Sequence, residues 1–170
     1  KDVGAQAITV GNPEGIHFAF DARHSRLALA WRGKYIDAES AWADRFNPFV
    51  EPLGEDQYIL PDGMPIAAIK APHDSWPLFI GEASGFTFKG YRLDEAGVPT
   101  FLYTLTVDDE VIQIAETLTA SSDQKLLRTF VITGNKTTPL YMRRMKDGKP
   151  QRIHLEASTT PTKVNWEVTW

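Results

Sequence analysis

Alternation of apolar and polar residues, interrupted by turn sequences, dominates the chain from residue 86 onward. Phe101, Tyr103 and Leu105 fall on one side of such a run, because successive side chains of a β-strand point to opposite faces. Turn sequences rich in Asp and Gly, at 95–97 and 108–109, separate the runs. The strands expected from this pattern are 86–94, 99–107, 111–118, 126–133, 140–145, 152–157 and 164–170.

So many short strands with frequent turns predict an all-β chain, an antiparallel two-sheet β-sandwich with long irregular loops. We expect residues 1–170 to form this single β-sandwich domain, since no linker or internal repeat divides them. The run at 27–31 is apolar on both faces, as in a central strand. The alternation fails at 38–58 and 71–77, where prolines indicate long loops, although 38–46 is a candidate for a short helical turn. The residues expected in the core are Trp31, Phe88, Phe101, Tyr103, Ile114, Phe130 and Trp166.

The composition excludes several kinds of chemistry. The chain has no cysteine, which rules out structural disulfides, thiolate nucleophiles, Cys-ligated zinc and covalent haem attachment through C-x-x-C-H. No apolar run approaches the roughly 20 residues of a transmembrane helix. The net charge is -4, and the one local basic cluster, Arg143, Arg144 and Lys146, is interpreted as a solvated strand end. Nucleic acid is therefore not an expected partner.

A set of short segments resembles a known type of bacterial module. The segments are 15–21, 29–33, 37–38, 42–45, 52–54, 88–94 and 97–103, with sequences such as GIHFAFD, LAWRG, WADR and FKGYRLD. Together they resemble an uncharacterised non-haem β module, which sits beside c-type cytochrome domains in large exported proteins of planctomycete-type and related bacteria.

This resemblance implies a periplasmic or otherwise exported location and a place in an electron-transfer assembly of respiratory or photosynthetic type. It implies a c-type cytochrome or a membrane electron-transfer complex as the partner, with the haem in that partner. Because this chain has no C-x-x-C-H, no cofactor is expected in it. The leading interpretation is a non-catalytic accessory or interaction subunit, not an enzyme, that docks a cytochrome-bearing or membrane-embedded partner.

Aromatic and charged residues in the two predicted loops are the candidates for the docking surface. Exposed aromatic anchors ringed by polar groups are typical of the centre and rim of a protein interface. The residues predicted to bind the partner are Trp42, Phe46, Phe49, Trp76, His73 and Asp74. Asp44 and Arg45 are instead predicted to form an ion pair that pins the segment 38–54.

Two other functions remain open at this point. Trp42, Trp76 and Tyr35 could act as the stacking platforms of a carbohydrate-binding module. Asp37 and Asp44 could act as the carboxylate pair of a glycoside-type hydrolase, which needs one acid and one base or nucleophile.

His17 is the histidine whose neighbours best suit a haem ligand or a base, because it alternates with phenylalanines on an expected strand. The favoured interpretation is a hydrogen-bonded structural histidine. No two histidines are spaced three to five residues apart, so the sequence predicts no metal site.

Overall fold

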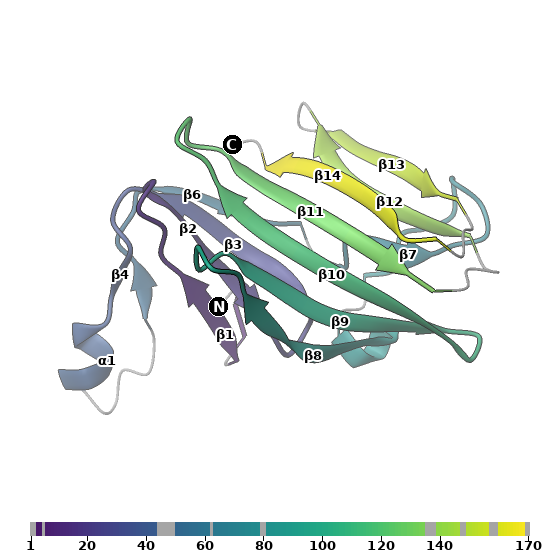
Figure 1. Cartoon of the computed structure of the whole chain (residues 1–170), viewed down its shortest axis with the longest axis horizontal. Coiled ribbons are helices and arrows are strands. Elements are labelled where there is room, and N and C mark those ends of the chain that lie inside the picture. The colour runs from purple at the N-terminus through teal and green to yellow at the C-terminus, as the bar shows by residue number, and fades with distance from the viewer. Residues whose placement is uncertain are drawn as a thin grey trace.

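The computed structural model describes residues 3–4, 6–43, 50–61, 63–78, 81–134, 139–146, 149–156 and 160–168. In these ranges the chain consists of antiparallel strands, one α-helix of five residues and one short 3-10 helix. Figure 1 shows the strands of the largest sheet crossing the front of the molecule. The predicted all-β character is confirmed.

The largest sheet contains five strands from the second half of the chain. They are β8 (Phe86–Leu93), β9 (Pro99–Val107), β10 (Glu110–Ala120), β11 (Leu126–Thr133) and β14 (Thr162–Val168), in the order β14-β11-β10-β9-β8. Alternation explains these strands: in β9 every second residue from Pro99 to Leu105 is buried. Asp108 and Asp109 both have positive φ, 48° and 66°, which suits the two-residue hairpin turn between β9 and β10.

A second sheet contains four strands from the first third of the chain. They are β1 (Ala7–Val10), β2 (Ile16–Asp21), β3 (Arg26–Arg32) and β6 (Asp56–Ile59), in the order β1-β2-β3-β6. The prediction of a central strand at 27–31 is confirmed, since β3 is paired on both edges and is buried over nearly its whole length. Ala19, Leu29 and Trp31 form a separate cluster on the sheet's outer face.

The remaining elements are short. A three-stranded sheet consists of β13 (Lys149–Leu155), β12 (Leu140–Lys146) and β7 (Ile66–Ala68), and a two-stranded one of β4 (Ile36–Asp37) and β5 (Glu51–Pro52). The helices are α1 (Glu39–Ala43), inside the predicted helical turn, and η1 (Gly81–Ser84). Strands of two to four residues, such as β4 to β7, are too short to show a period in the sequence.

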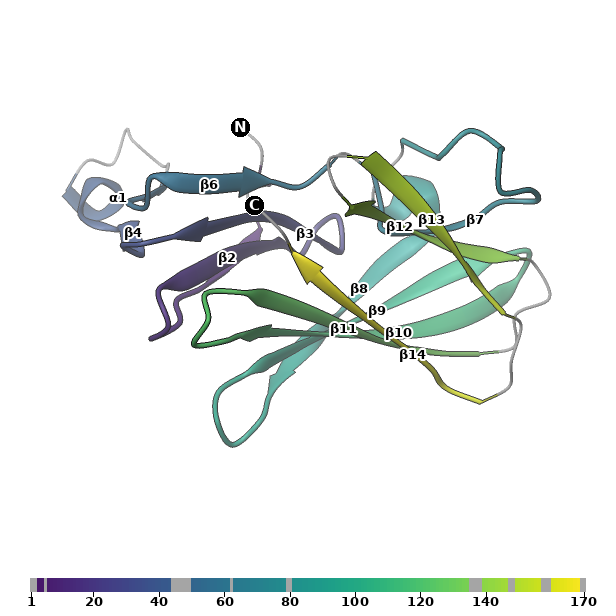
Figure 2. The ribbon, with the colours of Figure 1, turned by 90° about the horizontal axis from the view of Figure 1, so that it is seen from above.

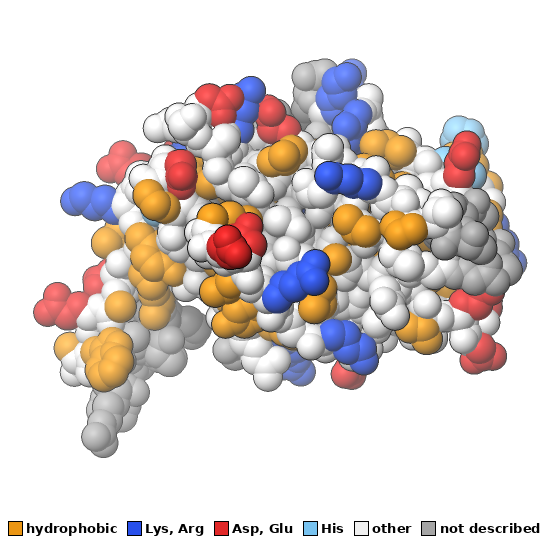
Figure 3. Space-filling model, in the orientation of Figure 1, with side chains coloured by type: hydrophobic (Ala, Val, Ile, Leu, Met, Phe, Trp, Pro, Cys, Tyr) orange, Lys and Arg blue, Asp and Glu red, His pale blue; other side chains and the backbone are white. Residues whose placement is uncertain are grey.

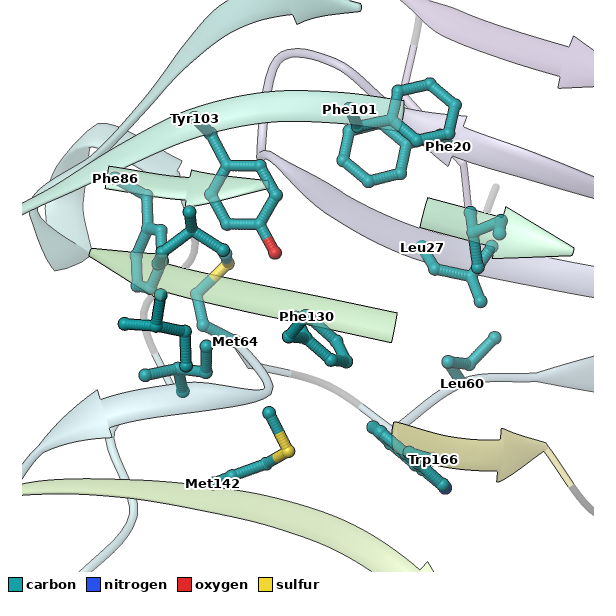
Figure 4. Close-up of a cluster of buried hydrophobic side chains, with 14 of the residues drawn as sticks. Phe20, Leu27, Leu60, Met64, Phe86, Phe101, Tyr103, Phe130, Met142 and Trp166 are labelled. Carbon is teal, nitrogen blue, oxygen red and sulfur yellow. The ribbon is translucent and has the colours of Figure 1, made fainter. Parts of the chain in front are cut away.

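The main core lies between the five-stranded sheet and the two sheets above it. In Figure 2 the four-stranded and three-stranded sheets lie on the same side of the five-stranded sheet. Phe20 on β2 stacks on Phe101 on β9, with ring centroids 3.9 Å apart (Figure 4). Six of the seven residues predicted in the core are buried, whereas Phe88 is only partly buried because β8 is an edge strand.

A charged network lies within this core. The ion pair joins Glu116 on β10, which is 0% exposed, to Arg128 on β11, which is 1% exposed. Arg128 Nε donates to Glu116 Oε1 at 2.7 Å, and the Tyr103 hydroxyl donates to Oε2 at 2.9 Å. The guanidinium lies over the Trp166 ring, 4.4 Å from its centroid. Burial and the Glu116 carboxylate raise the pKa of Tyr103 well above its ordinary value, so the phenol stays protonated and donates.

Candidate functional site

Residues 33–43 and 50–55 form an arm that leaves the four-stranded sheet after β3 and returns to it at β6. Figures 1 and 2 show the arm, marked by β4 and α1, projecting from one end of the molecule. Pairing of β4 with β5 joins its outgoing and returning limbs. At its base a Cβ on Gly54 would lie 2.0 Å from the carbonyl oxygen of Arg32, so only glycine permits this close backbone approach.

Trp31, near the end of β3, anchors the arm to the sheet. Its buried indole Nε1 donates to the carbonyl oxygens of Lys34 and Tyr35, at 3.1 and 2.8 Å. The Tyr35 ring lies parallel to the indole, with centroids 6.1 Å apart, and its hydroxyl donates to Thr9 Oγ1 on β1 at 2.8 Å. These contacts join the stem of the arm, residues 33–35, to strands β3 and β1 of the sheet.

The outer part of the arm presents apolar side chains to solvent. Trp42 on α1 is 88% exposed, more than any other large hydrophobic residue that the structure describes. Val50 and Leu53 on the returning limb are also exposed. Figure 3 shows hydrophobic side chains gathered over the arm, at the lower left. An apolar protrusion of this kind is unusual on a surface that contacts only water.

An apolar groove runs between the arm and the outer face of the four-stranded sheet, with a volume of about 560 Å³. Its walls include Ala19, Leu29 and Trp31 from the sheet and Ile36, Val50 and Pro52 from the arm. A concave apolar surface suits an apolar side chain or ligand, because binding removes both surfaces from water.

The prediction that Trp76 is an exposed anchor is wrong. Its side chain is only 8% exposed, and it packs in a small cluster with Ala67, Ile69 and Tyr141. The indole Nε1 donates to the carbonyl oxygen of Met64 at 3.0 Å, which supplies the partner that a buried Trp needs. The sequence did not indicate this burial, because Tyr141, one of the residues that pack against Trp76, lies far away in the sequence.

The two loops that were predicted to form one docking surface lie apart. Figure 2 places α1 and β7, after which the second loop begins, at opposite ends of the molecule. His73 and Asp74 are exposed in that second loop. The Asp74 carboxylate accepts a hydrogen bond from the Ala71 N–H at 2.9 Å, so it shapes the loop itself.

Several other predicted residues can be placed or set aside. Asp44, Arg45, Phe46 and Phe49 lie outside the described residues, so the Asp44–Arg45 ion pair stays a prediction. Asp37 Oδ1 accepts a hydrogen bond from the Glu39 N–H at 2.9 Å, so this carboxylate caps the start of α1. Of the three aromatic residues considered as sugar platforms, Tyr35 is partly buried, Trp76 is buried and Trp42 is exposed.

His17 is a structural histidine, as its sequence context indicated. Its Nδ1 accepts a hydrogen bond from the Asn12 N–H at 3.1 Å, so Nε2 carries the proton and donates to the carbonyl oxygen of Gly33 at 2.8 Å. The imidazole is buried beside the rings of Trp31 and Tyr35. Since Gly33 is the first residue of the arm, His17 helps to fix where the arm leaves the sheet.

We expect His17→Ala to lower the free energy of unfolding by about 1–3 kcal/mol, because two backbone groups would lose their partner in a part-buried site. Urea denaturation measures the loss. His73→Ala, at an exposed histidine, should change stability by less than about 0.5 kcal/mol. A contrary result would be that the unaltered chain binds haem stoichiometrically and shows a Soret band, and that His17→Ala loses this band without losing stability. That result would contradict the structural role of His17.

Among the described residues, no three His, Asp or Glu side chains are grouped so as to hold a metal ion. No helix in those ranges has the length and apolar character needed to cross a bilayer. Comparisons with protein-family models, curated proteins and solved structures found no match. The arm and its groove are therefore the features from which a function can be argued.

Proposed function

We propose that this chain is a β-sandwich accessory domain that binds a protein partner through its arm and performs no catalysis itself. The observation that carries the proposal is the exposure of Trp42, at 88%, on a projecting stem held by the buried Trp31. Tryptophan is enriched among the residues that dominate binding energy, because burying its large ring against a partner removes much apolar surface from water. A fixed stem also lowers the entropy lost on binding.

The groove beside the arm supports the same function. Anchors on one protein commonly insert into pockets on the other, so the arm and the groove offer complementary contacts on one surface. Val50 belongs to both features, since it lines the groove and is exposed on the arm. A partner that covers the arm would thus also fill the groove.

For the partner, we propose a cytochrome-bearing or membrane-embedded component of an exported, periplasmic electron-transfer assembly, with the haem held in that partner. The sequence resemblance supports this choice. Several of its segments supply residues at the base of the arm, namely His17, Trp31, Gly33 and Gly54. The resemblance therefore falls on the part of the fold that positions Trp42.

We expect Trp42→Ala to abolish co-purification with a haem-bearing complex from native membranes while leaving the fold intact. An exposed side chain contributes little to stability, so the free energy of unfolding should change by less than about 0.5 kcal/mol. The measurement is affinity capture with the tagged chain, followed by the Soret absorbance of the eluate and identification of its proteins.

Leu93→Ala is the matched control, because Leu93 is an exposed apolar residue on β8 of the five-stranded sheet, whereas the arm extends from the four-stranded sheet. It should capture the complex as well as the unaltered chain. Equal capture by Trp42→Ala would refute the arm as the binding surface. If a glycan array binds the unaltered chain, and Trp42→Ala loses that signal, a carbohydrate-binding function would replace the proposal.

A further inference from the structure

The β12–β13 hairpin concentrates positive charge on a chain whose net charge is -4. Its described residues include five Lys or Arg residues and no Asp or Glu: Arg143, Arg144, Lys146, Lys149 and Arg152. Arg143 lies directly opposite Arg152 in the pairing register, and Lys146 lies opposite Lys149. Like charges in such positions destabilise a sheet, so their placement calls for a compensating interaction.

Arg143 and Arg152 both lie over the ring of Trp76. Their guanidinium carbons lie 5.1 Å (Arg143) and 5.5 Å (Arg152) from the centroid of its ring. Arg152 Nη1 also donates to the carbonyl oxygens of Pro72 and Asp74, so the loop that carries Trp76 holds this side chain by hydrogen bonds as well. Both cations are therefore held in place before any ligand arrives, which lowers the entropic cost of binding.

An open cavity of about 350 Å³ lies where these groups meet. Its described lining residues are Pro72, His73, Trp76, Arg143, Pro150 and Arg152, and among these there are two cations and an imidazole but no carboxylate. The nearby Asp74 carboxylate is engaged by the Ala71 N–H. We infer that this cavity is a binding site for the phosphate group of a phosphomonoester or of inorganic phosphate.

The chemistry of the lining favours phosphate over a single carboxylate. Guanidinium groups match phosphate oxygens in a planar, bidentate geometry. Two guanidinium charges also balance a dianion better than a monoanion. The rims formed by Pro72 and Pro150 leave an apolar surface beside the charged groups, which suits the organic part of a phosphomonoester. This site lies far from the arm, at the end of the molecule where β7 and β13 are drawn in Figure 2, and does not depend on the function proposed for the arm.

Isothermal titration at constant ionic strength, in a chloride buffer without other oxyanions, tests the inference. We expect one saturable site for inorganic phosphate and weaker binding of acetate. Phenyl phosphate that binds more tightly than inorganic phosphate would identify an organic phosphate as the ligand, and equal binding would identify the free ion. Acetate that binds as tightly as phosphate, or the absence of saturable phosphate binding, would overturn the inference.

Arg152→Gln should weaken phosphate binding about tenfold or more, because it removes a charge-assisted contact but keeps an amide that can donate to the loop carbonyls. Lys149→Gln removes the same charge from the same hairpin outside the cavity, and should change the affinity less than about twofold. If both variants lost the same phosphate affinity, the binding would depend only on the general surface charge, and the site would be refuted.

Should Arg152→Gln fail to fold, His73→Ala provides a second test at an exposed residue of the cavity. It should still weaken phosphate binding about threefold. An unchanged affinity in His73→Ala would then count against the site.

Discussion

Glu116→Leu should lower the free energy of unfolding by about 3–5 kcal/mol, which is the cost of leaving a buried charge without its partner. The Arg128 guanidinium would stay in the core without its carboxylate partner, and the Tyr103 hydroxyl would lose the oxygen that accepts its hydrogen bond. Urea denaturation at neutral pH, followed by tryptophan fluorescence, measures the change.

The double variant Glu116→Leu with Arg128→Met separates the ion pair from the surrounding packing. Removing both charges also removes the cost of burying them, so we expect the double variant to regain most of the lost stability. A double variant as unstable as Glu116→Leu alone would mean that the charged pair itself stabilises the fold. The contacts of the Arg128 guanidinium with the rings of Phe130 and Trp166 would then be the expected source of that stabilisation.

Phe101→Ala should cost a similar amount, about 3–5 kcal/mol, through lost burial and the cavity left behind. The Phe101 ring is fully buried and stacks on Phe20 of the opposite sheet at 3.9 Å, so its removal opens a gap between two sheets (Figure 4). The loss is measured by urea denaturation. A cost below about 1 kcal/mol would show that this face does not hold the two sheets together.

Tyr91→Ala provides the comparison for Phe101→Ala. Tyr91 is the direct neighbour of Phe101 on β8 in the pairing register, but its side chain is exposed because β8 is an edge strand. The same kind of truncation should therefore cost well under half as much there. Equal costs at the two positions would show that burial does not set the size of the effect.

Alternation alone predicted the positions of the five strands of the largest sheet and most of the core residues that they carry, because long strands with one buried face show that face in every second residue. The turns at 95–97 and 108–109 marked the hairpins correctly. Glu116 and Arg128 lie in step with the buried residues of β10 and β11, but their charge argued against a buried position. Charged residues in an alternating run suggest the solvent face, and only the paired strands show that the two charges neutralise each other inside.

The site was harder to predict, since it depends on which distant segments cover a loop. Trp42 and Trp76 both lie in segments with prolines, yet Trp42 is exposed, whereas Trp76 is buried in a cluster that includes the remote residue Tyr141. Trp42, an aromatic residue in a polar segment, was a local signal of the arm's exposed surface, and the apolar Val50 and Leu53 were a second one that the sequence analysis missed. Nothing local indicated that Arg143 and Arg152 would meet on Trp76.

The sequence by itself determined the all-β character, the positions of the long strands and the exclusion of any chemistry that needs cysteine. These properties follow from the local periodicity of the backbone and from composition, so they can be read without knowing any contact. Tertiary structure alone decided that His17 would brace the arm, that Trp42 would project from it, and that Trp76 would support two arginines. Burial and hydrogen bonding at these positions depend on residues far apart in the chain, such as His17 with Gly33 and Trp76 with Arg152, and no periodicity in the sequence encodes such pairings.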